Sequence, residues 1–291
     1  MQTIETFAVV GGDLRAAYLA GLLAQDGYKV ITAGLDGTDL PPCVTGCTNI
    51  TQAVSLADCV ILPLPFTTDG NMVNAPFSRV RIQPEQVLGC LTPAQFVAAG
   101  GLPDVWQTQL AVNGVAVHDY LAREELAILN SVPTAEGAVQ LAMEELPITL
   151  RGARALVTGY GRVARTLVSL LHAMGAAVTV AARRCEDRAA ATVAGCQSVT
   201  ISDMASAGDF DVIFNTVPAM LFSAELLKKL DPSTLLIDLA SRPGGVDFDA
   251  AAALRLKTVW ALSLPGRVAP KTAADILKRT ICNMLAEEGR I

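Results

Sequence analysis

Six residues near the middle of the chain have the types and spacing that bind a dinucleotide phosphate. Gly159-Tyr160-Gly161-Arg162-Val163-Ala164 fits the pattern G-x-G-x-x-G/A, follows the apolar run 155–158 and begins a stretch with helical spacing of apolar residues. In this context the first glycine permits a tight turn and the second lets the backbone approach a pyrophosphate. The helix N-terminus then attracts the negative charge. The sequence predicts a dinucleotide site here; the alternative is a structural turn alone.

The next expected strand ends in two arginines rather than an acid. The run "VTVAARRCED" places Arg183 and Arg184 where an NAD site typically carries the Asp or Glu that binds the ribose 2′-hydroxyl. A guanidinium group there suits a 2′-phosphate. The pattern favours NADP as the cofactor. NAD remains the alternative, because two solvated arginines after a strand would give the same sequence.

Loops rich in Pro, Gly and small hydroxyl residues follow four other expected strands. Ligands of doubly wound sheets bind beyond the carboxyl ends of the strands. The loops are Pro63–Asp69, Asn215–Pro218, Ala240–Gly245 and Leu264–Lys271. The expected cofactor contacts in these regions are Thr216, Val217, Pro218, Leu239 and Ala240. The expected substrate contacts are Pro65, Thr67, Thr68, Thr134, Ser241, Arg242, Pro243, Gly244, Gly245 and Arg267.

Arg242 is the main candidate for binding substrate charge. It follows an apolar strand and precedes Pro243, and its guanidinium offers two parallel donors to a carboxylate. With Arg267 and Lys271 it would suit a small polycarboxylate, whereas the alternative is an ion pair between Arg242 and Asp247. Glu136, at the start of an expected helix, is a candidate base, so the catalytic candidates are Arg242, Lys271 and Glu136.

Strands that alternate with helical patterns predict two Rossmann-like α/β units with doubly wound parallel sheets. We expect a substrate-side domain at 1–130 and an NADP-binding domain at 131–291. The alternation continues through 112–120 and 126–130. A crossover helix is expected at about 133–146 and a terminal helix at about 272–287, which packs back toward the first domain.

Composition narrows the function classes. Of the 291 residues 52% are hydrophobic and 17% are charged, and the net charge is -6, which argues for a globular protein without a broad basic field for nucleic acid. Apolar runs are too short for a membrane span, and the first residues read as a strand, so we expect a cytoplasmic protein. Neither the seven scattered cysteines, with Cys43 and Cys47 as the one close pair, nor His118 and His172 predict a metal site.

Several motifs together resemble the dipicolinate synthase A family. They are "VVGGDLR", "ILPLP", "NSVPTAEG", "GYGRVA", "NTVP", "LIDLASRPGGVDF" and "LPGRVAPKTA", in this order. The resemblance covers most of the chain and implies a two-domain fold like that of the D-2-hydroxyacid dehydrogenases. It also implies NADP-dependent formation of pyridine-2,6-dicarboxylate from a dihydro- or hydroxytetrahydro-dipicolinate. A flavoprotein-like partner, the B subunit of dipicolinate synthase, and a place in the mother cell of a spore-forming bacterium are implied as well.

Two other functions fit parts of the sequence. A D-2-hydroxyacid dehydrogenase needs a catalytic histidine, and no histidine lies between Gly175 and the C-terminus. A protein that binds NADP without catalysis and docks a flavoprotein fits the same glycine pattern. The sequence leaves a homo-oligomer open as well.

Overall fold

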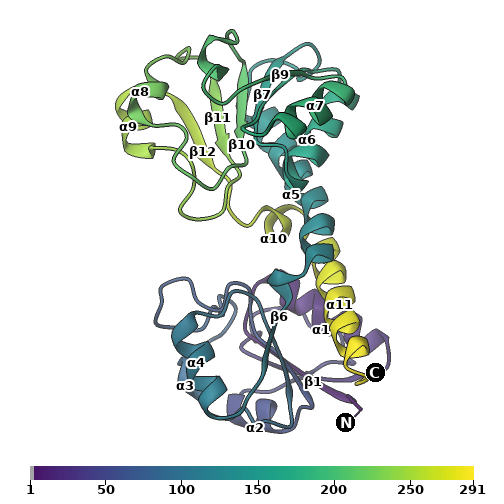
Figure 1. Cartoon of the computed structure of the whole chain (residues 1–291). Helices are drawn as coiled ribbons and strands as arrows, with labels where there is room; N and C mark the ends of the chain where they lie inside the picture. Colours follow the sequence, from purple (N-terminus) through teal and green to yellow (C-terminus); the bar gives the residue numbers. More distant parts are fainter. Residues whose placement is uncertain (1–2) are drawn as a thin grey trace. The chain divides into compact units, whose positions relative to one another are not determined.

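The computed structural model describes residues 3–291, which form two compact units. Unit 1 combines the chain up to Leu129 with Ala269–Ile291, and unit 2 is Asn130–Val268. Each unit contains one six-stranded parallel sheet flanked by helices (Figure 1). The α/β class and the two Rossmann-like sheets predicted from the sequence are therefore confirmed.

The sheet of unit 1 has the order β3-β2-β1-β4-β5-β6, and every pair is parallel. Its strands are β1 (Thr6–Val10), β2 (Lys29–Ala33), β3 (Thr45–Gly46), β4 (Cys59–Ile61), β5 (Phe96–Ala99) and β6 (Val117–Asp119). The central strands β1, β4 and β5 are almost wholly apolar because helices cover both faces of the sheet. The strand order reverses between β1 and β4, where doubly wound sheets bind ligands.

The helices of unit 1 come from both ends of the chain. They are α1 (Leu14–Gln25), α2 (Ile50–Ser55), α3 (Pro84–Leu88), α4 (Asp104–Val112), the 3₁₀ turn η1 (Tyr120–Ala122) and α11 (Pro270–Glu287). Figure 1 shows α11, in yellow, beside α1. Buried residues along one face of α11, including Ile276, Ile281 and Leu285, join the core made by β1 and α1.

This packing changes the division made from the sequence. Residues 131–291 were expected to form one domain, but the segment from Ala269 onward belongs to unit 1. The physical reason is that the apolar face of α11 packs on α1 and the sheet of unit 1. The helix was expected from about 272 and runs from Pro270 to Glu287, with the proline in its first turn.

The sheet of unit 2 has the order β12-β11-β10-β7-β8-β9 and is also parallel throughout. Its strands are β7 (Arg154–Thr158), β8 (Ala177–Ala181), β9 (Gln197–Val199), β10 (Val212–Asn215), β11 (Leu235–Asp238) and β12 (Lys257–Trp260). Its helices are α6 (Arg162–Ala173), α7 (Cys185–Val193), the 3₁₀ turn η2 (Met204–Ser206), α8 (Ala224–Leu227), α9 (Phe248–Ala253) and α10 (Leu264–Val268). The chain order reverses between β7 and β10.

Helix α5 (Glu124–Glu145) is longer than the crossover helix expected at about 133–146. The alternation of strands and helices was predicted to continue through residues 126–130, but these residues are part of α5. Pro133 lies inside the helix, although a proline interior to a helix removes one backbone hydrogen bond. The next residue, Thr134, donates its hydroxyl to the Asn130 carbonyl at 2.7 Å, which satisfies an acceptor near the proline.

The expected loop Leu264–Lys271 is also helical over most of its length. Leu264–Val268 form α10, and Pro270 and Lys271 begin α11. Leu264 is buried against Gly137, where an added Cβ would lie 3.2 Å from the leucine side chain. Small residues on α5 therefore allow α10 to pack closely.

Within residues 3–291, no helix is both long enough and apolar enough to cross a membrane. The same residues contain no group of three or more His, Cys, Asp or Glu side chains placed to hold a metal ion.

Candidate functional site

The glycine turn between β7 and α6 begins with a residue that must be glycine. Gly159 has a φ of +82°, a conformation that side chains with a Cβ rarely adopt. A Cβ at this position would lie 2.8 Å from Thr216 Oγ1 and 3.1 Å from Val217 Cγ2. Gly159 therefore lets the turn pass directly under the loop that follows β10.

Gly161 serves the turn in a different way. It is the N-cap of α6 in an extended conformation, and no side chain caps the helix. A Cβ built on Gly161 would meet no atom within 4 Å. The backbone at the start of α6 thus borders open space, as a pyrophosphate site requires. Behind it, Ala164 is fully buried and allows the helix to pack on the sheet.

Three buried polar side chains join the carboxyl ends of β7, β10 and β11. Thr158 Oγ1 donates to Asn215 Oδ1 at 2.6 Å, and Asn215 Nδ2 donates to Asp238 Oδ1 at 2.8 Å. The three residues occupy matching registers as the last residues of adjacent strands, and each has an exposed fraction of 0%. Buried polar atoms are stable only when hydrogen bonded, so this network fixes the three strand ends relative to one another.

The network also positions the loops that leave those strands. Asn215 Oδ1 accepts from the Val217 amide at 3.1 Å. Asp238 accepts from the amides of Ala240 and Gly245 at 3.0 and 2.8 Å. The sequence prediction missed this role, although a polar residue closing each of three apolar strands was a visible signal.

The Pro-Gly-Gly segment after β11 folds back beneath the strand ends. Gly244 has a φ of +84°, and a Cβ there would lie 3.0 Å from Asp238 Oδ2. A Cβ on Gly245 would overlap Asn215 Nδ2 and lie 2.7 Å from the Val217 carbonyl oxygen. The two glycines are thus packing requirements of the network, and their contact with substrate stays a prediction.

Arg242 lies beside an aromatic ring rather than beside an acid. Its guanidinium carbon is 5.6 Å from the centroid of Trp260, and the Trp260 ring stacks on Phe248 at 5.3 Å. Trp260 Nε1 also donates to the Ala240 carbonyl at 3.3 Å. Among the described residues Arg242 forms no ion pair, and Asp247, the alternative partner, caps α9 by accepting from the Ala250 amide. The guanidinium is exposed, and its donors have no acceptor among the described residues.

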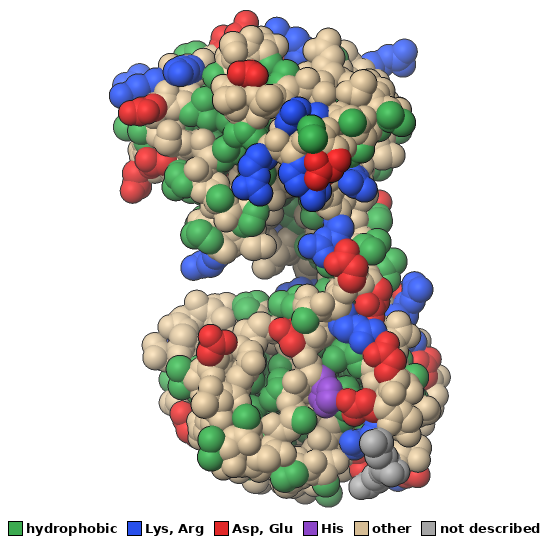
Figure 2. Space-filling model, in the orientation of Figure 1, with side chains coloured by type: hydrophobic (Ala, Val, Ile, Leu, Met, Phe, Trp, Pro, Cys, Tyr) green, Lys and Arg blue, Asp and Glu red, His purple; other side chains and the backbone are tan. Residues whose placement is uncertain are grey.

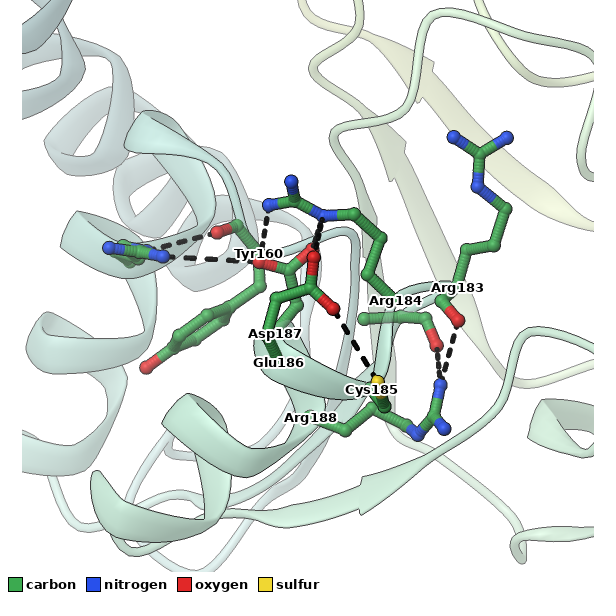
Figure 3. A network of polar contacts seen from close by, with 9 residues as sticks. Tyr160, Arg183, Arg184, Cys185, Glu186, Asp187 and Arg188 are labelled. Carbon is green, nitrogen blue, oxygen red and sulfur yellow. Dashed lines mark hydrogen bonds and ion pairs between the residues drawn. The ribbon is translucent and has the colours of Figure 1, made fainter.

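Figure 3 shows that the two arginines after β8 differ in their contacts. Arg184 donates from Nε and Nη2 to the two carboxylate oxygens of Asp187, both at 2.8 Å. The side chain of Arg183 points away from this network and forms no hydrogen bond or ion pair with another described residue. Of the two, Arg183 has the guanidinium that is available to a phosphate.

Asp187 connects Arg184 to the glycine turn. The Arg184 hydrogen bonds hold the pKa of the Asp187 carboxyl below its usual range. Arg165 lies 3.9 Å from the same carboxylate, donates to the Tyr160 carbonyl at 3.0 Å and packs over the Tyr160 ring. Burial raises the pKa of the Tyr160 phenol. Tyr160 and Arg162, predicted cofactor contacts, belong to this turn.

Four predicted residues of unit 2 lie on helices, whereas Pro218, Leu239, Ser241 and Pro243 lie in the loops after β10 and β11. Glu136 is exposed on α5, Arg267 is exposed on α10, and the Thr134 hydroxyl already donates within α5. Val163 lies in the first turn of α6. The Glu136 carboxylate forms no hydrogen bond or ion pair with another described residue.

The predicted residues of unit 1 lie in two places. Pro65, Thr67 and Thr68 are in the loop after β4, where Thr67 Oγ1 accepts from the Gly70 amide at 2.9 Å. Lys271, at the start of α11, instead lines a cavity of about 500 Å³ between α1 and the loop 37–41. Pro65, Thr67 and Thr68 do not line this cavity.

Figure 2 shows a group of basic side chains on the visible face of unit 2, with acidic side chains among them. Ion pairs of unit 2 between basic and acidic side chains include Arg184–Asp187 and Arg184–Glu186.

Comparisons with known proteins agree with this geometry. Residues 6–121 match the family model for the N-terminal domain of the dipicolinate synthase A subunit. Residues 126–261 match "D-isomer specific 2-hydroxyacid dehydrogenase, NAD binding domain", which covers the glycine turn and the buried network.

Full-length relatives extend the match over the whole chain. The dipicolinate synthase A subunit of Bacillus subtilis is 33% identical over 99% of this chain and 98% of its own length. The crystal structures of the Bacillus halodurans and Bacillus subtilis proteins superpose with TM-scores of 0.89 and 0.86 at 31% identity. They cover 98% and 99% of this chain, and this chain covers 99% and 97% of theirs. The chain therefore belongs to the dipicolinate synthase A family, as its motifs predicted, and is an NAD(P)-dependent oxidoreductase.

Proposed function

We propose that this protein oxidises dihydrodipicolinate to dipicolinate with NADP⁺. The ring transfers a hydride to the nicotinamide and releases one proton, so dihydrodipicolinate and NADP⁺ become dipicolinate, NADPH and H⁺. The dihydro compound forms from 4-hydroxy-tetrahydrodipicolinate by loss of water. Aromatisation supplies driving force, so the protein needs mainly to orient a ring C–H toward the cofactor.

Cofactor binding at the glycine turn is supported by the open space at Gly161 beside the uncapped N-terminus of α6. Gly159, Tyr160, Arg162 and Val163 form the rest of the turn. Loops held by the Asn215–Asp238 network bring Thr216, Val217, Pro218, Leu239 and Ala240 to the same strand ends. The nicotinamide cofactor supplies the hydride acceptor when it is bound.

The choice of NADP over NAD rests on Arg183. Its guanidinium has no hydrogen-bond or ion-pair partner among the described residues, whereas Asp187 holds the guanidinium of Arg184. A 2′-phosphate would accept hydrogen bonds from the Arg183 guanidinium, and no acid at this strand end offers the ribose hydroxyl a partner.

The proposed substrate site is based on Arg242, whose guanidinium lies over the Trp260 ring and has N–H donors without an acceptor among the described residues. We assign it to one carboxylate, with Ser241 and Pro243 beside it and Gly244 and Gly245 shaping the loop. Thr134, Arg267 and Lys271 and the loop residues Pro65, Thr67 and Thr68 are further proposed contacts. Glu136 is the proposed proton acceptor.

The direct test mixes the purified chain with NADP⁺ and freshly generated 4-hydroxy-tetrahydrodipicolinate. NADPH absorbance and the ultraviolet signature of the pyridine dicarboxylate are followed together. Both are expected to rise, and Arg242→Ala is expected to slow both. A chain that binds NADP⁺ but forms no product would sink the catalytic proposal.

A matched pair of variants tests the cofactor. Arg183→Ala should weaken NADP⁺ binding about 10- to 100-fold, the range of one or two hydrogen bonds to a charged group, and leave NAD⁺ binding unchanged. Arg184→Ala should have a much smaller effect because Asp187 already holds that guanidinium. Equal losses for NAD⁺ and NADP⁺ in Arg183→Ala would contradict the assignment.

A second arrangement follows from the name of the Bacillus relatives, because an A subunit implies a B subunit. We propose such a partner here, in the cytoplasm of the mother cell. If the chain alone is silent and turnover appears only with the B subunit, the chain is a cofactor-binding component. The match to the 2-hydroxyacid dehydrogenase domain adds one control, since turnover of a D-2-hydroxy acid would favour that activity instead.

A further inference from the structure

Arg15, in the first turn of α1, is a buried charge that the proposed function does not use. Only 10% of its side chain is exposed. Burying an arginine is costly unless its donors are paired, so its surroundings must compensate the charge.

Two acceptors hold the guanidinium in place. Nε and Nη2 donate to the two oxygens of Asp13 at 2.9 and 2.8 Å, and Nη2 also donates to the Leu64 carbonyl at 2.7 Å. Asp13 follows β1 and Leu64 follows β4. The guanidinium therefore joins the carboxyl ends of the two strands between which the sheet order reverses, where ligands of such sheets bind.

The third nitrogen, Nη1, has two N–H groups and no acceptor among the described residues. Among those residues the fully buried side-chain nitrogen and oxygen atoms without a partner are Asn130 Oδ1 and Arg290 Nε. Nη1 of Arg15 is not one of them, so it keeps contact with solvent. It is a donor of fixed orientation on a nearly buried cation.

A role in capping α1 does not account for the arginine. Asp13 caps α1 by accepting from the Arg15 amide. In unit 2, Asp247 caps α9 in the same way, through the Ala250 amide, and no arginine pairs with it among the described residues. The cap therefore needs the aspartate alone, and the guanidinium needs a separate explanation.

We propose that Arg15 binds a carboxylate of the substrate through Nη1, and that Asp13 and the Leu64 carbonyl position it. The proposal deepens the function proposed above, on which it rests, because it assigns a carboxylate contact to unit 1. The ligand class is a small planar ring with two carboxylates. The loop Pro63–Pro65, which Arg15 holds through Leu64, would form the neighbouring wall.

The test uses the full chain and measures binding rather than turnover. Calorimetry gives the affinities of pyridine-2,6-dicarboxylate and of the uncharged pyridine-2,6-dicarboxamide, and of NADP⁺ separately. Arg15→Gln should weaken binding of the dicarboxylate about 10- to 100-fold and remove most of the difference in affinity between the dicarboxylate and the diamide. NADP⁺ affinity should stay within about twofold, because the glycine turn is untouched. Arg279→Gln, an exposed arginine on α11, is the matched control and should change none of these values.

Two milder variants cover the case in which Arg15→Gln does not fold. Asp13→Asn keeps a good helix cap and the positive charge of Arg15, but it weakens the paired hydrogen bonds that hold the guanidinium. Arg15→Lys keeps the positive charge but removes the planar guanidinium with its paired donors. Each should weaken the dicarboxylate severalfold at an unchanged NADP⁺ affinity, with Asp247→Asn as the control for the cap. Dicarboxylate affinity equal to that of the unmodified chain in both variants, whatever their melting temperatures, overturns the proposal.

The outcomes separate this inference from the proposed function. An unmodified chain that binds the dicarboxylate through Arg15 but forms no product supports the inference and removes the catalytic proposal. A chain that turns over substrate normally after Arg15→Lys and Asp13→Asn keeps its function and removes the inference. An unmodified chain that shows no preference for the dicarboxylate over the diamide removes the inference as well.

Discussion

At the scale of single residues, both units hold their strand ends with buried polar side chains. In unit 2 these are Thr158, Asn215 and Asp238, and in unit 1 Arg15 plays this part with the half-buried Asp13 as its partner. Each group contributes hydrogen bonds to loop backbone that apolar residues could not make. These hydrogen bonds therefore position the loops that leave the strand ends.

Replacing Asp238 by asparagine should destabilise unit 2. The carboxylate accepts from Asn215 Nδ2 through one oxygen and from the Gly245 amide through the other, so an amide group would place a donor against a donor. A buried unsatisfied donor costs about 1–3 kcal/mol, and the free energy of unfolding should fall by that amount. Denaturant unfolding measures it, and Asp249→Asn at an exposed site is the control. An unchanged midpoint would show that the network is dispensable.

His118 should give unit 1 a stability that falls in mild acid. The ring stacks on Phe96, and burial lowers the pKa of His118 from its ordinary 6.5 although Glu288 opposes the shift. Below pH 6.5 the unfolded chain takes up a proton that the folded chain accepts only at lower pH. The free energy of unfolding should therefore decrease as the pH falls from 6.5 through the lowered pKa, and then level off.

The measurement is denaturant unfolding across this range. His118→Phe keeps a stacked ring without a titratable nitrogen and should flatten the dependence, whereas His172→Asn should not. The same slope in His118→Phe as in the unmodified chain would assign the effect to another group.

Residue contacts were the least predictable level. The position of Arg242 at a strand end follows from the sequence, but its contact with Trp260 depends on β12 lying beside β11. The pairing of Arg15 with Leu64 likewise joins residues far apart in the chain. No local pattern encodes such contacts, because they arise from strand order.

At the scale of elements, the glycine turn was the most predictable part. Its strand, turn and helix appear as expected because apolar periodicity and two glycines are local signals. Helix α5 was less predictable, since Pro133 and the apolar run before it suggested a boundary where the helix in fact continues. Proline penalties near 3 kcal/mol are overcome when a long helix packs against a core on the far side of the proline.

Replacing each glycine of the turn by alanine should affect a different property, stability at Gly159 and NADP⁺ affinity at Gly161. Gly159→Ala forces a Cβ into a left-handed conformation and against Thr216, and should cost about 1–2 kcal/mol of stability. In Gly161→Ala the added methyl group meets no atom and should leave the melting temperature nearly unchanged. The same methyl group fills the space expected for the pyrophosphate and should weaken NADP⁺ binding about 10-fold or more. Melting curves and cofactor titration distinguish the two. A Gly161→Ala protein with normal affinity would place the phosphates elsewhere.

At the scale of the whole molecule, unit 1 is built from the two ends of the chain. The sequence predicted two sheets and a terminal helix that packs back, and both are present. The predicted boundary nevertheless counted the last residues with the second domain, because the order of elements along the chain does not show how much of a helix belongs to a core formed by distant residues. The packing of α11 on α1 settles that assignment.

Ile281→Ala should therefore destabilise unit 1 rather than unit 2. Ile281 has an exposed fraction of 0% within the core of unit 1, and such a truncation costs about 2–5 kcal/mol. Hydrogen exchange followed by mass spectrometry should show faster exchange in β1 and α1, with β7 and β10 unchanged. The exposed Asn283→Ala on the same helix is the control. Faster exchange confined to unit 2 would contradict the assignment.

The split composition of unit 1 has a consequence for synthesis on the ribosome. Unit 2 is one continuous segment and is complete before the last residues emerge. The apolar face of α1 stays without its packing partner α11 while the second half of the chain is translated, which takes on the order of ten seconds or more. The first unit to be made is thus the last to be finished, and a nascent chain released before its final helix would expose the surface on which chaperones act.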